Sequence, residues 1–203
     1  YSNAAVQMLD KVTESTTGNK DLVFQALSLK SAVLLNMHQF KAALETAQKG
    51  VAINNYNAGI YGALVDANVE LGNYEEAVKD CDQMINIRPD LRSYSRASYL
   101  RQIYGQNKAA IEAMNMAVAA GMPGSETTEW ARTNLADLYL NTGNIDSASI
   151  LYRTSLVYRK DYPYALMGMS KVEQSKKNYD AAIAYTKSAI QVLSEAAFVS
   201  TLA

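Results

Sequence analysis

Side chains that commonly act as catalysts or metal ligands are scarce in this 203-residue chain. It contains one histidine, His38, and one cysteine, Cys81. A single cysteine allows no intramolecular disulfide and no cysteine-based metal site. Cys81 follows Ala77 by about one helical turn, where the surrounding pattern favours a buried apolar residue. We therefore predict that this thiol is a small core side chain and not a nucleophile.

Carboxylates form the densest cluster of titratable groups. Glu75, Glu76, Asp80 and Asp82 surround Lys79, and a pair of carboxylates can serve as general acid and general base. Acidic residues near the N-terminal end of a helix are also stabilised by its dipole while they face water, and this second interpretation is favoured. The chain has no glycine-rich phosphate loop, HExxH motif or GxSxG motif. The sequence predicts a protein that is not an enzyme and that uses no cofactor or metal.

A recurring alanine shows which elements position these residues. Its spacings of 34, 33, 38 and 34 residues lie in the range typical of stacked repeats, and the five positions are Ala43, Ala77, Ala110, Ala148 and Ala182. Around Ala131, Leu135 and Leu138 the apolar residues keep the 3.6-residue period of a helix. The pattern predicts a pair of helices in each repeat, with an alanine where the two helices pack closely.

Turns between the paired helices are marked five residues before each alanine. Glycine stands at this place in three repeats, where a tight turn needs a positive φ, and His38 and Lys177 take it in the first and last. The first helices are expected over Leu22–Asn36, Ala58–Leu71, Leu91–Tyr104, Glu126–Leu140 and Tyr164–Ser175. A second helix follows each of them, and residues 121–124 form a longer loop. Ala4–Glu14 is expected to end an earlier repeat, and Ala196–Ala203 to begin a sixth.

The second repeat carries a family resemblance in Tyr61, Leu64, Gly72, Tyr74, Ala77 and Pro89. These residues resemble the tetratricopeptide repeat, a helix–turn–helix of 34 residues. The resemblance implies an all-α, right-handed superhelical solenoid of about five such hairpins, of a bacterial type, with partial repeats at both ends. The whole chain, 1–203, is then a single repeat domain within a longer protein. Its repeats span approximately 24–57, 58–90, 91–124, 125–162 and 163–195, with partial repeats over 1–20 and 196–203.

In this family the first helices line a concave groove that binds protein or peptide segments, and the resemblance implies the same here. The inward stripe of a helix recurs at i, i+4, i+7 and i+11. Arginine and aromatic side chains dominate interface hot spots, and asparagine can pair with a peptide backbone. The groove residues expected on this basis are Asp66, Arg92, Arg96, Tyr99, Trp130, Asn134, Asp137, Tyr164 and Lys171. A simpler alternative stays open: Trp130 packs on the preceding loop, and Arg92 and Arg96 merely face water.

Other partners are less well supported. The two-carboxylate clamp of some family members is not expected, because the corresponding positions hold Ser28, Ala32 and Ala63. Arginines at 88, 92, 96 and 101 could meet nucleic acid, but the net charge of −1 and the neighbouring acids argue against it. No apolar run is long enough to span a membrane.

The alternative function is a ligand-binding component of a bacterial envelope system, for glycan or lipoprotein, since 14 tyrosines could stack on sugars. The compartment would be bacterial cytoplasm or periplasm. Weak self-association through uncapped ends is also expected, because open repeat ends expose their stacking faces.

Overall fold

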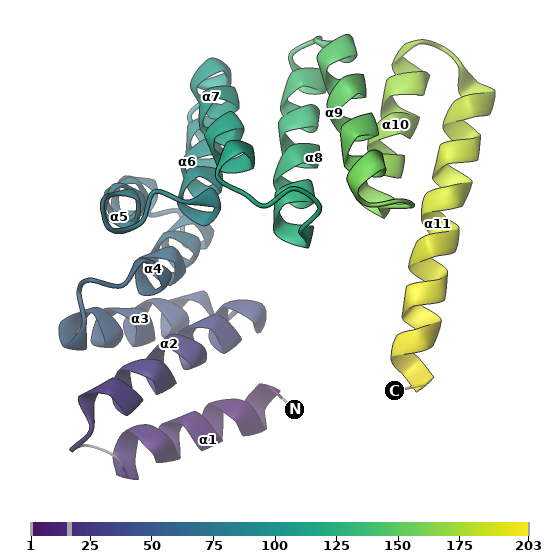
Figure 1. Cartoon of the computed structure of the whole chain (residues 1–203). Coiled ribbons are helices and arrows are strands. Elements are labelled where there is room, and N and C mark those ends of the chain that lie inside the picture. The colour runs from purple at the N-terminus through teal and green to yellow at the C-terminus, as the bar shows by residue number, and fades with distance from the viewer. Residues whose placement is uncertain (1, 16–17, 203) are drawn as a thin grey trace. The chain divides into compact units, whose positions relative to one another are not determined.

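Helices form all the regular structure of the described part of the chain. The computed structural model describes residues 2–15 and 18–202, with side chains described up to residue 194. Within these ranges there is no strand, which confirms the predicted all-α class. The helices, labelled in Figure 1, are α1 (Ser2–Ser15), α2 (Lys20–Asn36), α3 (Phe40–Ile53), α4 (Ala58–Glu70), α5 (Tyr74–Ile87), α6 (Leu91–Ile103), α7 (Asn107–Ala119), α8 (Glu126–Asn141), α9 (Ile145–Tyr158), α10 (Pro163–Ser175) and α11 (Tyr179–Leu202).

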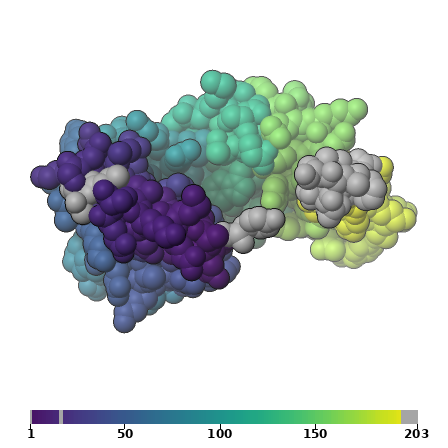
Figure 2. All heavy atoms as spheres, turned by 90° about the horizontal axis from the view of Figure 1, so that it is seen from below, coloured from purple at the N-terminus to yellow at the C-terminus, as the bar shows by residue number. Residues whose placement is uncertain are grey.

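Two compact units make up the chain, Tyr1–Leu100 and Arg101–Ala203, with the boundary near the end of α6. In the first unit α2 pairs with α3 and α4 with α5, while α3 also packs on α4. The helix α1 packs on α2 and forms the dark purple surface of this unit in Figure 2. In the second unit α8 pairs with α9 and α10 with α11, while α9 also packs on α10. Each unit thus repeats one hairpin and stacks it on the next.

Polar side chains and a proline begin the first helix of each hairpin. Asn57 accepts hydrogen bonds from the backbone N–H groups of Gly59 and Ile60 at the start of α4. Ser125 does the same for Thr128 in α8, and Pro163 occupies the first turn of α10. The Asn57 and Ser125 side chains satisfy N–H donors that have no partner within the helix, and Pro163 has no N–H to satisfy. The predicted starts agree with the observed ones to within two residues.

The turn within each hairpin has the left-handed conformation that the sequence predicts. Gly72, Gly105 and Gly143 have φ angles of 78°, 69° and 83°. His38 and Lys177, at the same place in their repeats, reach 56° and 61° despite their side chains. A φ in this range is strained for a residue with a Cβ, so the repeated geometry prevails over local preference.

The five recurring alanines are buried, as their proposed packing role requires. Four have no exposed surface, and Ala182 is 6% exposed. In the first unit Ala47, Ile60 and Leu64 form part of the adjoining core. In the second unit Ala148 packs in a cluster that includes Tyr152. A larger side chain at these alanines would force the paired helices apart.

The predicted start of a sixth repeat is wrong. The helix α11 continues without a break from Tyr179 to Leu202, through the position where a turn was expected near residue 195. The segment 193–198 contains no glycine or proline to stop a helix, and its residues are compatible with one. Ala203 lies outside the described residues. None of the described helices is both long enough and apolar enough to cross a membrane.

Candidate functional site

In the first unit, Arg96 on α6 forms a two-point ion pair with Asp66 on α4. The Nε–Oδ1 distance is 2.8 Å and the Nη2–Oδ2 distance is 2.6 Å. A Cβ added to Gly62 would lie 3.3 Å from the Arg96 Cζ atom, so the glycine leaves room for the guanidinium group. Such bidentate pairs fix both side chains. An incoming carboxylate would therefore compete with Asp66 for Arg96.

Two other predicted groove residues of the first unit remain open to solvent. Arg92 stands in the first turn of α6, and its guanidinium has no ion-pair partner among the residues that the structure describes. Tyr99 follows two turns later and is 53% exposed. The ion pair of Arg96 with Asp66 lies on the same helix pair. Within the described part of the chain, helix α6 therefore carries the unpaired Arg92 guanidinium and the exposed Tyr99 ring on either side, along the chain, of Arg96, whose charge is neutralised by Asp66.

In the second unit, Asp137 on α8 is held by donors from both helices that follow it. The hydroxyl of Tyr152 on α9 donates to Oδ1 at 2.9 Å, and the Lys171 Nζ on α10 donates to the same oxygen at 2.8 Å. Lys171 keeps about half of its side chain exposed. The carboxylate is therefore oriented, while the ammonium group can still meet another acceptor.

Tyr152 reaches Asp137 only because Gly168 has no side chain. The tyrosine is fully buried, and a Cβ on Gly168 would lie 2.1 Å from its Cε1 atom. Burial raises the pKa of the Tyr152 phenol well above its usual value, and the charge of Asp137 and the hydrogen bond to it add to this shift. The phenol thus stays protonated and remains a hydrogen-bond donor.

Trp130 and Tyr164 occupy the same repeat position, eighteen residues before the marker alanine, on α8 and α10. Trp130 is 44% exposed and Tyr164 57%, although the neighbours of Trp130, Thr128 and Glu129, are buried. The Asn134 Nδ2 donates to the Trp130 carbonyl at 2.7 Å. Asn134 therefore keeps its amide oxygen and one N–H for another partner.

Sequence reasoning missed the contacts that fix the start of α8. Glu129 is fully buried, its Oε2 accepts from the Arg132 Nε at 2.8 Å, and its Oε1 accepts from the Gly124 N–H at 3.0 Å. A buried carboxylate needs such partners. The spacing of three residues between Glu129 and Arg132 on a helix was the available signal.

The residues first considered for catalysis do not come together. Cys81 is buried, as predicted, and its thiol donates to the Ser93 carbonyl at 3.8 Å. The ring of His38 packs edge-on against Phe40. The described residues contain no group of three or more histidine, cysteine or acidic side chains arranged for a metal ion.

The acidic helix face is only partly as predicted. Glu75, Glu76 and Asp82 are exposed, but Asp80 is half-buried and accepts a hydrogen bond from Asn68 at 2.9 Å. Asp80 is turned toward α4 because it follows the buried Ala77 by three positions, and residues three apart lie on the same face of a helix. The expectation of a wholly solvated face is therefore wrong for this residue.

Hairpins that recur with the same turn geometry and the same small packing residue define an all-helical repeat protein. Residues 58–91 and 131–161 match the Tetratricopeptide repeat family. The chain therefore carries two segments that are similar to this repeat. No curated protein matches the sequence.

Several solved structures are similar in fold. BtubC (BKLC) from P. vanneervenii has a TM-score of 0.77 and 12% identity, over 96% of this chain and 89% of that one. PilF of Pseudomonas aeruginosa has a TM-score of 0.73 and 15% identity, over 85% and 77%. YrrB, described as a TPR protein with an unusual peptide-binding site, has a TM-score of 0.59 and 16% identity, over 91% of both chains. These identities show a common fold, and proteins built from this repeat are generally interaction scaffolds rather than enzymes.

Proposed function

We propose that this chain is a protein–protein interaction scaffold whose first helices bind a peptide or protein segment. The observation that carries the proposal is the pair of exposed aromatic residues, Trp130 and Tyr164, at one repeat position of the second unit. Large aromatic side chains supply much of the energy of interfaces. The surface of α8 and α10 therefore offers two anchoring points.

Polar groups beside the aromatic residues match the chemistry of an extended segment. Asn134 keeps a free amide oxygen and an N–H group, which suit the N–H and carbonyl of a peptide backbone. Lys171 presents a half-exposed ammonium group, and Asp137 is held in place by Tyr152 and Lys171. Groups that are already oriented lose less conformational freedom when a partner binds.

The first unit has candidate contact residues of its own on the first helices of its hairpins. Arg92 and Tyr99 are exposed, while Arg96 is neutralised by Asp66. A partner carboxylate would meet Arg92 without displacing an existing ion pair. We therefore assign charge recognition in this unit to Arg92 and assign Arg96 to holding α4 and α6 in register.

A selection for binding peptides tests the proposal. A phage-displayed library is selected on the whole chain, and the affinity of a recovered peptide is measured by calorimetry for the unaltered chain and for Trp130→Ala and Tyr164→Ala. Each variant should weaken binding by about tenfold or more, as hot-spot truncations do. Tyr179→Ala is the matched control, because Tyr179 is 58% exposed but lies on the second helix of its hairpin.

The control separates the helix face from general surface effects. Peptides that bind the Trp130 and Tyr164 variants as tightly as the unaltered chain would refute binding on this face. Equal losses in the Tyr179 variant would refute it as well. Circular dichroism establishes that each variant keeps its helices.

A further inference from the structure

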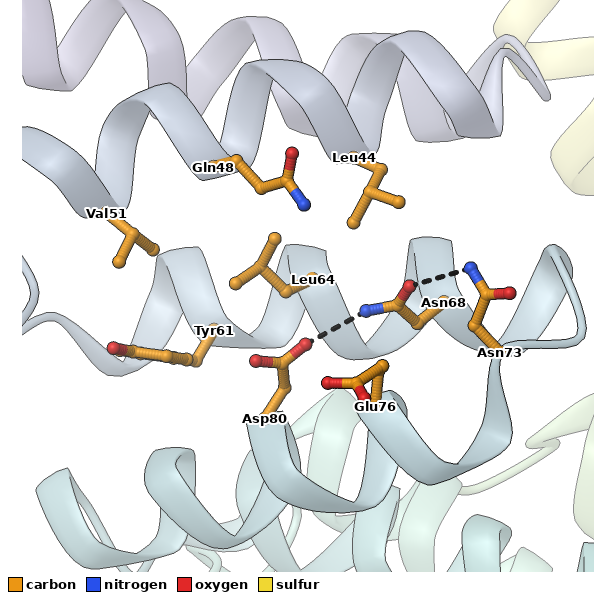
Figure 3. A pocket seen from close by; sticks show the side chains of 9 residues that line it. All are labelled: Leu44, Gln48, Val51, Tyr61, Leu64, Asn68, Asn73, Glu76 and Asp80. Carbon is orange, nitrogen blue, oxygen red and sulfur yellow. Dashed lines mark hydrogen bonds between the residues drawn. The ribbon is translucent and has the colours of Figure 1, made fainter.

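A groove on another face of the first unit has no role in the proposed binding surface. It lies between α3 and α5 and is floored by α4, with a volume of about 460 Å³, within the range of small-molecule and side-chain sites. Figure 3 shows apolar residues together with Gln48 and Asn68 from α3 and α4 along its length, and two carboxylates from α5 on its lower side. Its lining includes Leu44, Val51, Tyr61, Leu64, Glu76 and Asp80.

The groove is separate from the predicted peptide-binding stripe. Leu64 and Asn68 line it, whereas Asp66 points to the stripe and binds Arg96. Residues two apart on a helix diverge by roughly 200°. The same helix α4 therefore presents one face to each site.

The carboxylates break the repeat pattern. Glu76 and Asp80 stand one residue before and three after the marker alanine. The other four repeats place uncharged residues at these two positions, which are Ala42 and Thr46, Ala109 and Ala113, Ser147 and Leu151, and Ala181 and Tyr185. Building the hairpin does not require a charge there, so the acids of α5 need another explanation.

Asp80 is held in place with one oxygen turned to a fixed donor. Asn68 is buried, and its Nδ2 donates to Asp80 Oδ2 at 2.9 Å. The Asn68 Oδ1 accepts from the Asn73 Nδ2 at 3.2 Å, which fixes the orientation of the amide, as the dashed lines in Figure 3 show. Among the described residues, Asp80 Oδ1 has no hydrogen-bond partner.

The charge of Asp80 is poorly compensated within the chain. Burial raises the pKa of this carboxyl above its ordinary value and the neighbouring Glu76 adds to the shift, although the hydrogen bond from Asn68 and the charge of Lys79 oppose it. Lys79 pairs with Glu76 at 2.7 Å, with both side chains largely in water. A pair so exposed contributes little and can be exchanged for another partner.

We infer that this groove binds the side chain of a lysine or arginine from a partner protein. The aliphatic stem would pack against Leu44, Val51 and Leu64. The cationic head would meet Asp80 Oδ1 and Glu76, with the face of Tyr61 nearby as a second favourable contact for a cation. Charge complementarity selects this occupant, since an acidic side chain is repelled and an apolar one leaves the half-buried carboxylate uncompensated.

Nuclear magnetic resonance titration of the whole chain with blocked pentapeptides tests the inference. The probes carry lysine, arginine, norleucine or glutamate between flanking alanines. Norleucine has the lysine stem without its charge. The lysine or arginine peptide should give saturable shifts at Leu44, Leu64 and Asp80, and Asp80→Asn with Glu76→Gln should weaken binding by about tenfold.

Asp82→Asn is the matched control, because Asp82 is an exposed acid of the same helix that does not line the groove. Its affinity for the lysine peptide should be unchanged. The inference would be overturned if the norleucine peptide bound as tightly as the lysine peptide, or if no shifts appeared at Leu44, Leu64 and Asp80. It would also be overturned if the Glu76/Asp80 variant bound the lysine peptide as tightly as the unaltered chain, or if the Asp82 variant lost as much affinity as the Glu76/Asp80 variant. Trp130→Ala leaves this groove intact, so failure here and failure of the proposed function are distinguishable.

Discussion

Replacing Gly168 by alanine is the sharpest test of how the second unit is packed. The new Cβ would lie 2.1 Å from Tyr152 Cε1 and 2.3 Å from its Cζ, far inside the contact distance of two carbons. The tyrosine ring has little room to yield, because it is fully buried and its hydroxyl is bound to Asp137. The added methyl group therefore has to displace the ring or separate α9 from α10.

The cost follows from what the displaced ring loses. Burial of a large side chain contributes roughly 2–3 kcal/mol, and a hydrogen bond to a charged group about 1.5–3 kcal/mol. Alanine in a helix interior returns about 1 kcal/mol relative to glycine. Because partial rearrangement saves some of the contacts, the free energy of unfolding should fall by about 3 kcal/mol, measured by urea denaturation followed by circular dichroism.

A double-mutant cycle shows whether Tyr152 is the cause. Tyr152→Ala removes the ring and should itself destabilise by about 3–5 kcal/mol. In that background Gly168→Ala should become neutral or stabilising, since it fills part of the cavity and favours the helix. The reasoning is refuted if Gly168→Ala leaves the urea midpoint unchanged, or if it costs as much without the tyrosine ring as with it.

Four further substitutions test the close packing at the alanines, the turn at Lys177 and the burial of Tyr152. Ala77→Leu and Ala148→Leu should each lower the free energy of unfolding by about 1–3 kcal/mol through overpacking, and unchanged urea midpoints would contradict close packing at the recurring alanine. Lys177→Gly should raise stability by about 0.5–1 kcal/mol in thermal denaturation, because the position has a φ of 61° that glycine adopts without strain; a lower melting temperature would contradict this. The pKa values of Tyr152 and Tyr162 are raised, in each case chiefly by burial, so their contribution is complete below the ordinary tyrosine pKa of about 10 and is lost as pH rises above it. Tyr152→Phe should make stability less sensitive to pH above about 10, and an unchanged alkaline profile in urea denaturation would count against this assignment.

The fold was predictable because its determinants are local and recur. A glycine five residues before three of the five marker alanines predicts a left-handed turn, and Gly72, Gly105 and Gly143 have it. The burial of the alanines follows from the same spacing. The end of the chain was mispredicted because the repeat period suggested a turn near residue 195 where the residues themselves contain no stop signal.

The site was predictable only in part. Exposed positions such as Tyr99 and Tyr164 follow from helical spacing, since they need no knowledge of a neighbour. The contacts between hairpins do not follow from it. Arg96 meets Asp66 from 30 positions away, and Tyr152 passes Gly168 to reach Asp137. Such contacts depend on how one hairpin stacks on another, which spacing within a single helix cannot specify.

Departures from the repeat are the best guide to what distinguishes this chain within its fold. Four residues after the marker alanine, the other repeats have Ala47, Cys81, Met114 and Thr186, and the fourth has Tyr152. The larger residue is accommodated by a compensating glycine and reaches an acid on the first-helix face. Asp80 likewise occupies a position that is uncharged in every other repeat, and there the chain provides an oriented amide and an open groove. Residues that follow the period are accounted for by stacking alone. At Tyr152 and Asp80 a bulky or charged side chain replaces the periodic residue, and its neighbours are arranged to hold it. Stability alone does not explain why these residue types stand there. Partner recognition should therefore be tested first at these two positions.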